Sequence, residues 1–179
     1  MTVSEAPMQT APSATDREVL ITRTFDAPRD LVFQAWTDPE HLKRWYAPQG
    51  CTIDFAVLDL RQGGTFHSCI RTPDGYDCWC KGVYLEIVPP ERIVYTLAIA
   101  DEHGNLVDST DGGKDSDWPR ETTVTVTFAE HGRQTKLTLH QTVSEELAKR
   151  TGAHPSWLQM LDRLAEDLAA GREDLSASS

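Results

Sequence analysis

Positive charge is scarce in this sequence: 17 Lys and Arg residues stand against 28 Asp and Glu residues, and the formal net charge is −11 over 179 residues. Proteins that bind nucleic acid gather Lys and Arg to neutralise phosphates, and no basic run is present here. The sequence also has no apolar stretch long enough to cross a bilayer. We therefore expect no nucleic acid among the partners and no membrane insertion.

Both ends of the chain have little of the apolar content that a folded core requires. Residues 1–17 are rich in Ser, Thr, Pro and Ala, and they do not combine a basic start with an apolar stretch as a secretory signal does. We expect disordered tails at 1–17 and 172–179 and one folded domain over 18–171, which is an ordinary size for a single domain. With no export signal, we expect a cytoplasmic protein whose four cysteines are reduced.

Motifs for catalysis are also missing. The sequence contains neither Gly-x-Ser-x-Gly nor His-Glu-x-x-His, and its histidines are scattered over different segments. A nucleophile needs a base within hydrogen-bond reach and a third group that orients the base. We therefore assign no catalytic residue, no metal ligand and no cofactor.

The pattern of apolar residues predicts an α+β fold. A β-branched strand at 19–25 leads into two short helices, 29–36 and 39–45, the second with Asp38 as N-cap and Pro39 at its first position. Alternating or apolar segments then predict strands at 52–57, 65–71, 76–88, 92–100, 121–128 and 133–141, which makes about seven strands, mostly antiparallel. Trp157, Leu161, Leu164 and Leu168 form one stripe of a final helix from His154 to Ala170, with Gly171 as its stop.

Three cysteines and a histidine lie near the turn at 72–75, and the register of that hairpin decides whether they cluster. If Arg71 faces Tyr76, then Cys69 faces Cys78 and His67 faces Cys80, a set of zinc-like ligand types or a cross-strand disulfide. If Thr72 faces Tyr76 instead, Cys69 faces Trp79 and the cluster does not form. Both registers are open at this point.

Several motifs stand in the order and spacing of a known family. They are Phe25-Asp26-Ala27-Pro28, the segment from Trp36 to Leu42, Trp45, the segment from Asp59 to Gly64, Pro73-Asp74-Gly75, the segment from Gly82 to Arg92, and Trp157 with Leu161-Asp162-Arg163-Leu164. Over about residues 18–170 the chain resembles the heat-shock-protein-90 ATPase activator homologue family, within the START-like (SRPBCC) superfamily of helix-grip folds. The resemblance implies a curved antiparallel sheet that grips a long C-terminal helix around an internal apolar cavity.

The implied cavity supplies the candidate ligand-binding residues. Large apolar side chains expected between sheet and helix are Phe55, Phe66, Trp79, Tyr95, Val126, Trp157 and Leu161. The alternative is that these side chains are ordinary core packing. The loop 101–120, rich in Asp and Gly, is a solvated segment that could cover the cavity mouth.

Three functions compete. The favoured one is binding of a small apolar or amphipathic ligand, such as a lipid, an aromatic compound or a polyketide-like molecule. The second is a cyclase-like, aromatase-like or hydrolytic enzyme, because relatives in the superfamily are polyketide cyclases or aromatases. The third is contact with a chaperone, since the family takes its name from a co-chaperone. Only residues 1–17 precede the expected domain, so we expect chaperone-ATPase activation less than ligand binding.

Overall fold

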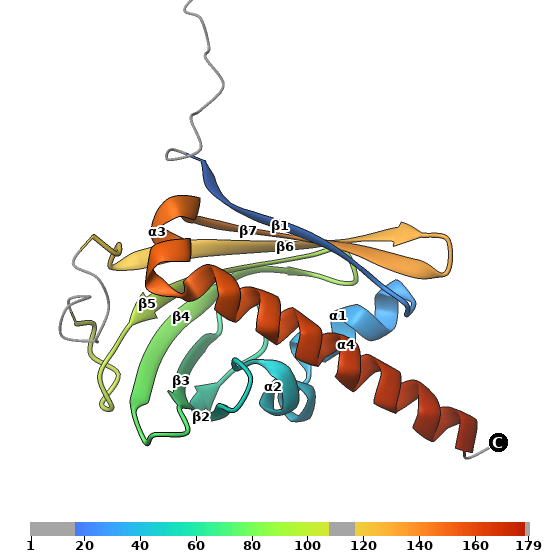
Figure 1. Cartoon of the computed structure of the whole chain (residues 1–179), viewed down its shortest axis with the longest axis horizontal. Coiled ribbons are helices and arrows are strands. Elements are labelled where there is room, and N and C mark those ends of the chain that lie inside the picture. The colour runs from blue at the N-terminus through green and yellow to red at the C-terminus, as the bar shows by residue number, and fades with distance from the viewer. Residues whose placement is uncertain (1–16, 108–116, 178–179) are drawn as a thin grey trace, which may run out of the picture.

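The structure is a computed structural model that describes residues 17–107 and 117–177, with side chains as far as residue 171. One curved, seven-stranded antiparallel sheet holds a long C-terminal helix across its inner face (Figure 1). The strands are β1 (Glu18–Phe25), β2 (Thr52–Leu58), β3 (Thr65–Arg71), β4 (Asp77–Val88), β5 (Arg92–Ile99), β6 (Glu121–His131) and β7 (Gln134–Ser144), and the helices are α1 (Arg29–Thr37), α2 (Pro39–Trp45), α3 (Glu145–Thr151) and α4 (Ala153–Ala177). The strand order is β1-β7-β6-β5-β4-β3-β2. The predicted α+β architecture is confirmed.

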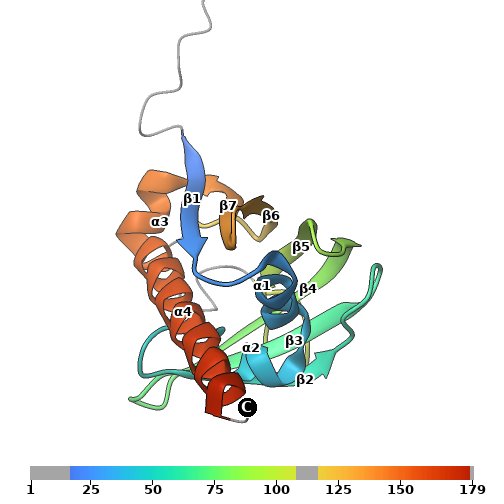
Figure 2. The ribbon, with the colours of Figure 1, turned by 90° about the vertical axis from the view of Figure 1, so that its right-hand side faces the viewer.

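The second of the two short helices between β1 and β2 begins where its capping residue predicts. The Asp38 carboxylate accepts a hydrogen bond from the backbone N–H of Glu40 at 2.8 Å, and Pro39 is the first residue of α2. The indole N–H of Trp45 donates to the carbonyl of Ala35 at 2.9 Å, which ties the two helices together. Helix α2 also packs against α4 and β2, so the pair lies beside α4 at one end of the sheet (Figure 2).

The hydrophobic core lies between the inner face of the sheet and the apolar stripe of α4. Alternate residues of β6 and β7 point inward because side chains alternate between the two faces of a strand. The predicted stripe of α4 is confirmed, since all four of its residues are buried. The buried residues at the centre of this core are Val124, Val126, Phe128, Leu137, Leu139, Trp157, Leu161, Leu164 and Leu168. No helix in the described part of the chain combines the length and the apolar composition needed to cross a membrane.

The C-terminal region differs from the prediction in two places. Helix α3, which the sequence analysis did not predict, starts with Ser144, whose hydroxyl accepts from the N–H of Leu147 at 3.1 Å, and it ends at Gly152 with φ of +88°. Helix α4 does not stop at Gly171 but continues to Ala177. Gly171 has no positive φ and so does not cap the helix. The segment 172–177, predicted as part of a tail, is therefore helical.

At the other end, the predicted tail 1–17 lies outside the described residues except for Arg17. The Arg17 guanidinium donates to the Glu145 carboxylate of α3 at 2.7 Å, and the carbonyl of Arg17 accepts from the N–H of Glu145 at 2.7 Å. These contacts attach the start of β1 to α3.

Replacement of Gly171 by alanine should stabilise the protein. Gly171 is helical and exposed, and an added Cβ would meet no atom within 4 Å. Because glycine costs about 1 kcal/mol relative to alanine inside a helix, the free energy of unfolding should rise by up to about 1 kcal/mol, with fraying near the helix end reducing the gain. Urea denaturation measures this change. A loss of stability would show that Gly171 ends the helix, as the sequence suggested.

Candidate functional site

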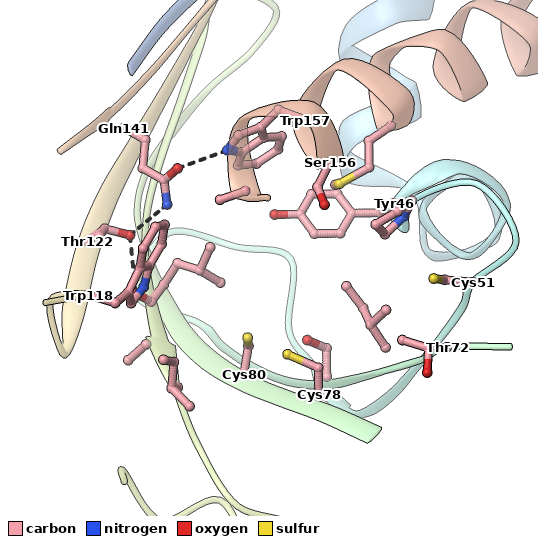
Figure 3. Close-up of a pocket in the computed structure, with 18 of the residues that line it drawn as sticks. Tyr46, Cys51, Thr72, Cys78, Cys80, Trp118, Thr122, Gln141, Ser156 and Trp157 are labelled. Carbon is pink, nitrogen blue, oxygen red and sulfur yellow. Dashed lines mark hydrogen bonds between the residues drawn. The ribbon is translucent and has the colours of Figure 1, made fainter. Parts of the chain in front are cut away.

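A pocket in the described part of the chain, here called the main pocket, lies between the inner face of the sheet and the first turns of α4. Its volume is about 280 Å³, just below the usual range for sites that hold drug-sized ligands. Its walls come from the α2–β2 connection, strands β3 to β7, the segment before β6 and α4 (Figure 3). The lining residues are Tyr46, Pro48, Cys51, Ser68, Ile70, Thr72, Tyr76, Cys78, Cys80, Leu97, Ala98, Ile99, Trp118, Thr122, Gln141, Ala153, Ser156, Trp157 and Met160.

The chemistry of this lining is apolar with a few neutral polar groups. Among the described residues that line the main pocket there is no Asp, Glu, His, Lys or Arg side chain. A carboxylate or ammonium group buried there would lose its hydration without gaining a charged partner, which is costly. The pocket is therefore suited to uncharged molecules.

A chain of hydrogen bonds organises one wall of the main pocket. The indole N–H of Trp157 donates to Gln141 Oε1 at 2.9 Å, and Gln141 Nε2 donates to the Thr122 hydroxyl at 3.0 Å (Figure 3). The Thr122 hydroxyl donates in turn to the carbonyl of Leu97 at 3.3 Å. Because Gln141, Thr122 and Trp157 are all buried, these bonds fix their side chains and join α4 to strands β5, β6 and β7.

A pair of tyrosines connects the main pocket to a second, small pocket of about 20 Å³, which has room for about one water molecule. The hydroxyl oxygens of Tyr46 and Tyr95 are 2.5 Å apart and share a hydrogen bond. Tyr46 lines both pockets, whereas Tyr95 lines only the small one. Burial raises the pKa of both phenols above the usual value for tyrosine, so both keep their protons at neutral pH.

The structure places the seven candidate residues in four different locations. Only Trp157 lines the main pocket, while Phe55, Phe66 and Tyr95 line the small pocket. Val126 and Leu161 are fully buried in the core and are not among the lining residues of either pocket. Contrary to the expectation from sequence, the seven side chains therefore do not surround one cavity.

Trp79 lies on the opposite face of the sheet, contrary to the expectation that it points toward α4. Its neighbours Cys78 and Cys80 line the main pocket, and side chains of a strand alternate between faces. The ring of Trp79 instead packs against His67, with centroids 4.9 Å apart. His67 Nε2 lies 2.9 Å from the carbonyl oxygen of Asp101, so the loop after β5 covers this outer face. Residues 108–116 of the predicted loop lie outside the described part.

The register of the hairpin formed by β3 and β4 also separates the cysteines. The N–H of Thr72 donates to the carbonyl of Tyr76 at 2.9 Å, and Cys69 faces Trp79 while Ile70 faces Cys78. This is the second of the two registers considered from sequence, so the cluster of His67, Cys69, Cys78 and Cys80 does not form. Within the described residues, no set of His, Cys, Asp and Glu side chains could hold a metal ion, and none of the four cysteines forms a disulfide.

Sequence analysis missed most of the residues that line the main pocket. Gln141 could have been found, because alternation along β7 places it on the same face as Leu137 and Leu139, where a polar side chain stands out. The same argument would have found Thr122, because alternation along β6 places it on the same face as Val126. Tyr46 and Cys51 belong to an irregular connection, where no periodicity indicates which way a side chain points.

A curved antiparallel sheet that holds a long C-terminal helix defines a class of protein, the helix-grip domains. The family model described as activator of Hsp90 ATPase homolog 1-like protein matches residues 26–169, and the chain belongs to this family. No curated protein matches the sequence.

Solved structures of bacterial proteins have the same fold. A crystal structure from Chromobacterium violaceum is 26% identical, with a TM-score of 0.67 over 83% of this chain and 94% of that one. A solution structure from Arthrobacter aurescens is 21% identical, with a TM-score of 0.76 over 89% of this chain and 90% of that one. A crystal structure of a protein from Silicibacter pomeroyi described as AHSA1 is 19% identical, with a TM-score of 0.68 over 87% of this chain and 99% of that one.

Proposed function

We propose that this domain binds one small, uncharged apolar or amphipathic molecule in the main pocket. The observation that carries the proposal is the pairing of a volume of about 280 Å³ with a lining that contains no charged side chain among the described residues. Pockets for small molecules are typically concave and apolar with a few placed polar groups. Gln141, Thr122 and Ser156 supply such groups here.

The size and polarity of the main pocket narrow the class of ligand. A volume just below the drug-sized range suits about two or three fused rings or a short acyl chain. The free carboxylate of a fatty acid would have no charged partner in the lining, so an aromatic compound, a neutral lipid fragment or a polyketide-like ring system fits better. The neutral lining also favours binding over acid–base chemistry, which needs ionisable groups at the reacting atoms.

The proposal predicts that filling the pocket abolishes binding while the fold is kept. Ser156 lies in the first turns of α4 and its side chain points into the main pocket (Figure 3). A phenylalanine at this position would occupy the space of a ligand. We expect Ser156→Phe to weaken binding of N-phenyl-naphthylamine, an uncharged fluorescent probe, by at least about tenfold. Fluorescence titration measures this affinity.

A matched control introduces the same side chain on the other side of the same helix. Leu158 is two residues further along α4 and 39% exposed, so Leu158→Phe should leave the affinity unchanged. Circular dichroism should give the same helix content for both variants. Equal binding by wild type, Ser156→Phe and Leu158→Phe would place the probe outside the main pocket and contradict the proposed function.

A further inference from the structure

The hydroxyl groups of Tyr46 and Tyr95 carry two protons, but the hydrogen bond between them uses only one. Both phenols are protonated at neutral pH, as argued above, and one O–H donates to the other oxygen across 2.5 Å. The second O–H has no hydrogen-bond acceptor among the described residues. A buried hydroxyl proton without an acceptor is costly, so the pair is poised to donate to an acceptor that enters one of the two pockets.

The direction of the shared bond decides which pocket receives this proton. If Tyr46 donates to Tyr95, the remaining proton belongs to Tyr95, which lines only the small pocket. If Tyr95 donates to Tyr46, the remaining proton belongs to Tyr46, which also lines the main pocket. Figure 3 shows the Tyr46 ring reaching into the main pocket, with its hydroxyl directed away from Cys51 and Thr72. An acceptor in the main pocket therefore selects the second arrangement.

We propose that Tyr46 is a hydrogen-bond donor to a carbonyl oxygen, such as that of a ketone, ester or quinone, in the ligand of the main pocket, and that Tyr95 is the positioning residue that orients it. This inference rests on the proposed function, because it assigns a polar feature to the same neutral ligand. Donation from Tyr95 to Tyr46 polarises the Tyr46 hydroxyl, so the two bonds strengthen each other.

A carbonyl matches the pair better than other oxygen groups. The pair offers a donor and needs an acceptor, and a ketone or quinone oxygen accepts without bringing a proton that would need a partner of its own. A carboxylate also accepts, but no charged side chain among the described lining residues would compensate its burial. The rings of Tyr46 and Trp157 pack edge-to-face against each other, with centroids 6.0 Å apart. Both residues line the main pocket, so a flat ring system that carries the carbonyl would meet an aromatic surface there.

Two probes of nearly equal shape test the assignment: fluorenone, which has a ketone, and fluorene, which has a methylene group in its place. We expect wild-type protein to bind fluorenone about fivefold more tightly, because a net hydrogen bond is worth a few-fold to about tenfold in affinity. Tyr46→Phe should abolish this preference, so that fluorenone and fluorene bind this variant with equal affinity. Tyr95→Phe should keep part of the preference, because the Tyr46 hydroxyl remains but is no longer oriented.

The infrared stretching frequency of isotope-labelled fluorenone gives a second readout that a merely structural role would not move. A hydrogen bond weakens the ketone double bond, so the frequency should be lowest in wild type, intermediate in Tyr95→Phe and highest in Tyr46→Phe. Trp79→Phe, which changes an aromatic residue on the outer face, should match wild type. Melting temperatures of the variants establish that each one is folded.

The assignment of Tyr46 and the proposed function would fail with different experimental results. Equal binding of the two probes to wild type, with the same ketone frequency in wild type and Tyr46→Phe, would overturn the assignment of Tyr46 while the pocket remains a binding site. If neither probe stabilises or binds wild type, the proposed function fails and the assignment fails with it. Loss of both fluorene and fluorenone binding in a folded Tyr46→Phe variant would show that Tyr46 shapes the pocket and is not a selective donor.

Discussion

Replacement of Gly82 by alanine is expected to lower the free energy of unfolding by about 3 kcal/mol or more. A Cβ at this position in β4 would lie 1.9 Å from the carbonyl oxygen of Thr96 in β5 and 2.6 Å from the ring of Phe66 in β3. The first of these atoms belongs to the backbone of a central strand and cannot move without breaking the sheet register. The absence of a side chain at Gly82 therefore lets Phe66 lie across the strand.

The same substitution should also disturb the small pocket. The Phe66 ring packs edge-on against Tyr95, with centroids 5.9 Å apart, so a displaced Phe66 would shift the partner of Tyr46. Guanidinium denaturation of Gly82→Ala beside Gly171→Ala measures the contrast, because the second variant adds the same methyl group where nothing opposes it. Equal stabilities for the two variants would contradict the close packing between β3, β4 and β5.

Replacement of Arg163 by methionine should have the second large effect. The Arg163 guanidinium, on α4, donates to the carbonyls of Arg44 at 2.7 Å and Ala47 at 2.6 Å, and also to those of Pro48 at 3.2 Å and Cys51 at 3.3 Å. Since hydrogen bonds to charged groups contribute about 1.5–3 kcal/mol each but are not additive, we expect a loss of about 3 kcal/mol.

Ligand affinity should fall together with stability in this variant. Pro48 and Cys51 line the main pocket, and Arg163 fixes the backbone of the connection that carries them. Arg163→Lys should recover only part of both properties, because a single ammonium cannot replace the two terminal nitrogens of the planar guanidinium. Chemical denaturation and titration with the uncharged fluorescent probe measure the two effects.

A control for Arg163 is an arginine that pairs with the same helix only at the surface. Arg23 of β1 pairs with Asp162 of α4 at the surface, and exposed ion pairs contribute about 0–1 kcal/mol. Arg23→Met should therefore change stability by less than about 1 kcal/mol and leave probe affinity unchanged. If Arg23→Met and Arg163→Met behaved alike, the carbonyl contacts of Arg163 would have no special role.

Local patterns in the sequence were sufficient to predict the order and type of most helices and strands. Asp38 and Pro39 mark the start of α2, and period-two alternation marks β6 and β7, because capping and strand faces depend on residues within a few positions of one another. Helix α3 was missed because it is short and its capping residue, Ser144, ends a strand. Gly171 was misread as a stop because a glycine acts as a helix cap only where φ is positive.

The sequence could not settle the strand register, and the register decided where several candidate residues lie in the sheet. A turn that follows Arg71 and a turn that follows Thr72 are both reasonable. A shift of the register by one residue nevertheless alters which side chains face each other. The structure closes the hairpin with Thr72 bonded to Tyr76, which leaves Cys78 and Cys80 in the main pocket and puts Trp79 on the outer face. No local signal distinguishes these outcomes, because the difference in energy comes from burial across the whole sheet.

By itself the sequence determined the fold class, the family and the apolar stripe of α4, because each is encoded in spacing along the chain. Only the tertiary structure decided which residues form the main pocket and which hydroxyls meet. Tyr46 and Tyr95 are separated by 49 positions in the sequence, and Gln141 and Trp157 come from a strand and a helix. A pocket is the space that packing leaves between elements, so its volume and lining follow from the positions of all the surrounding elements together.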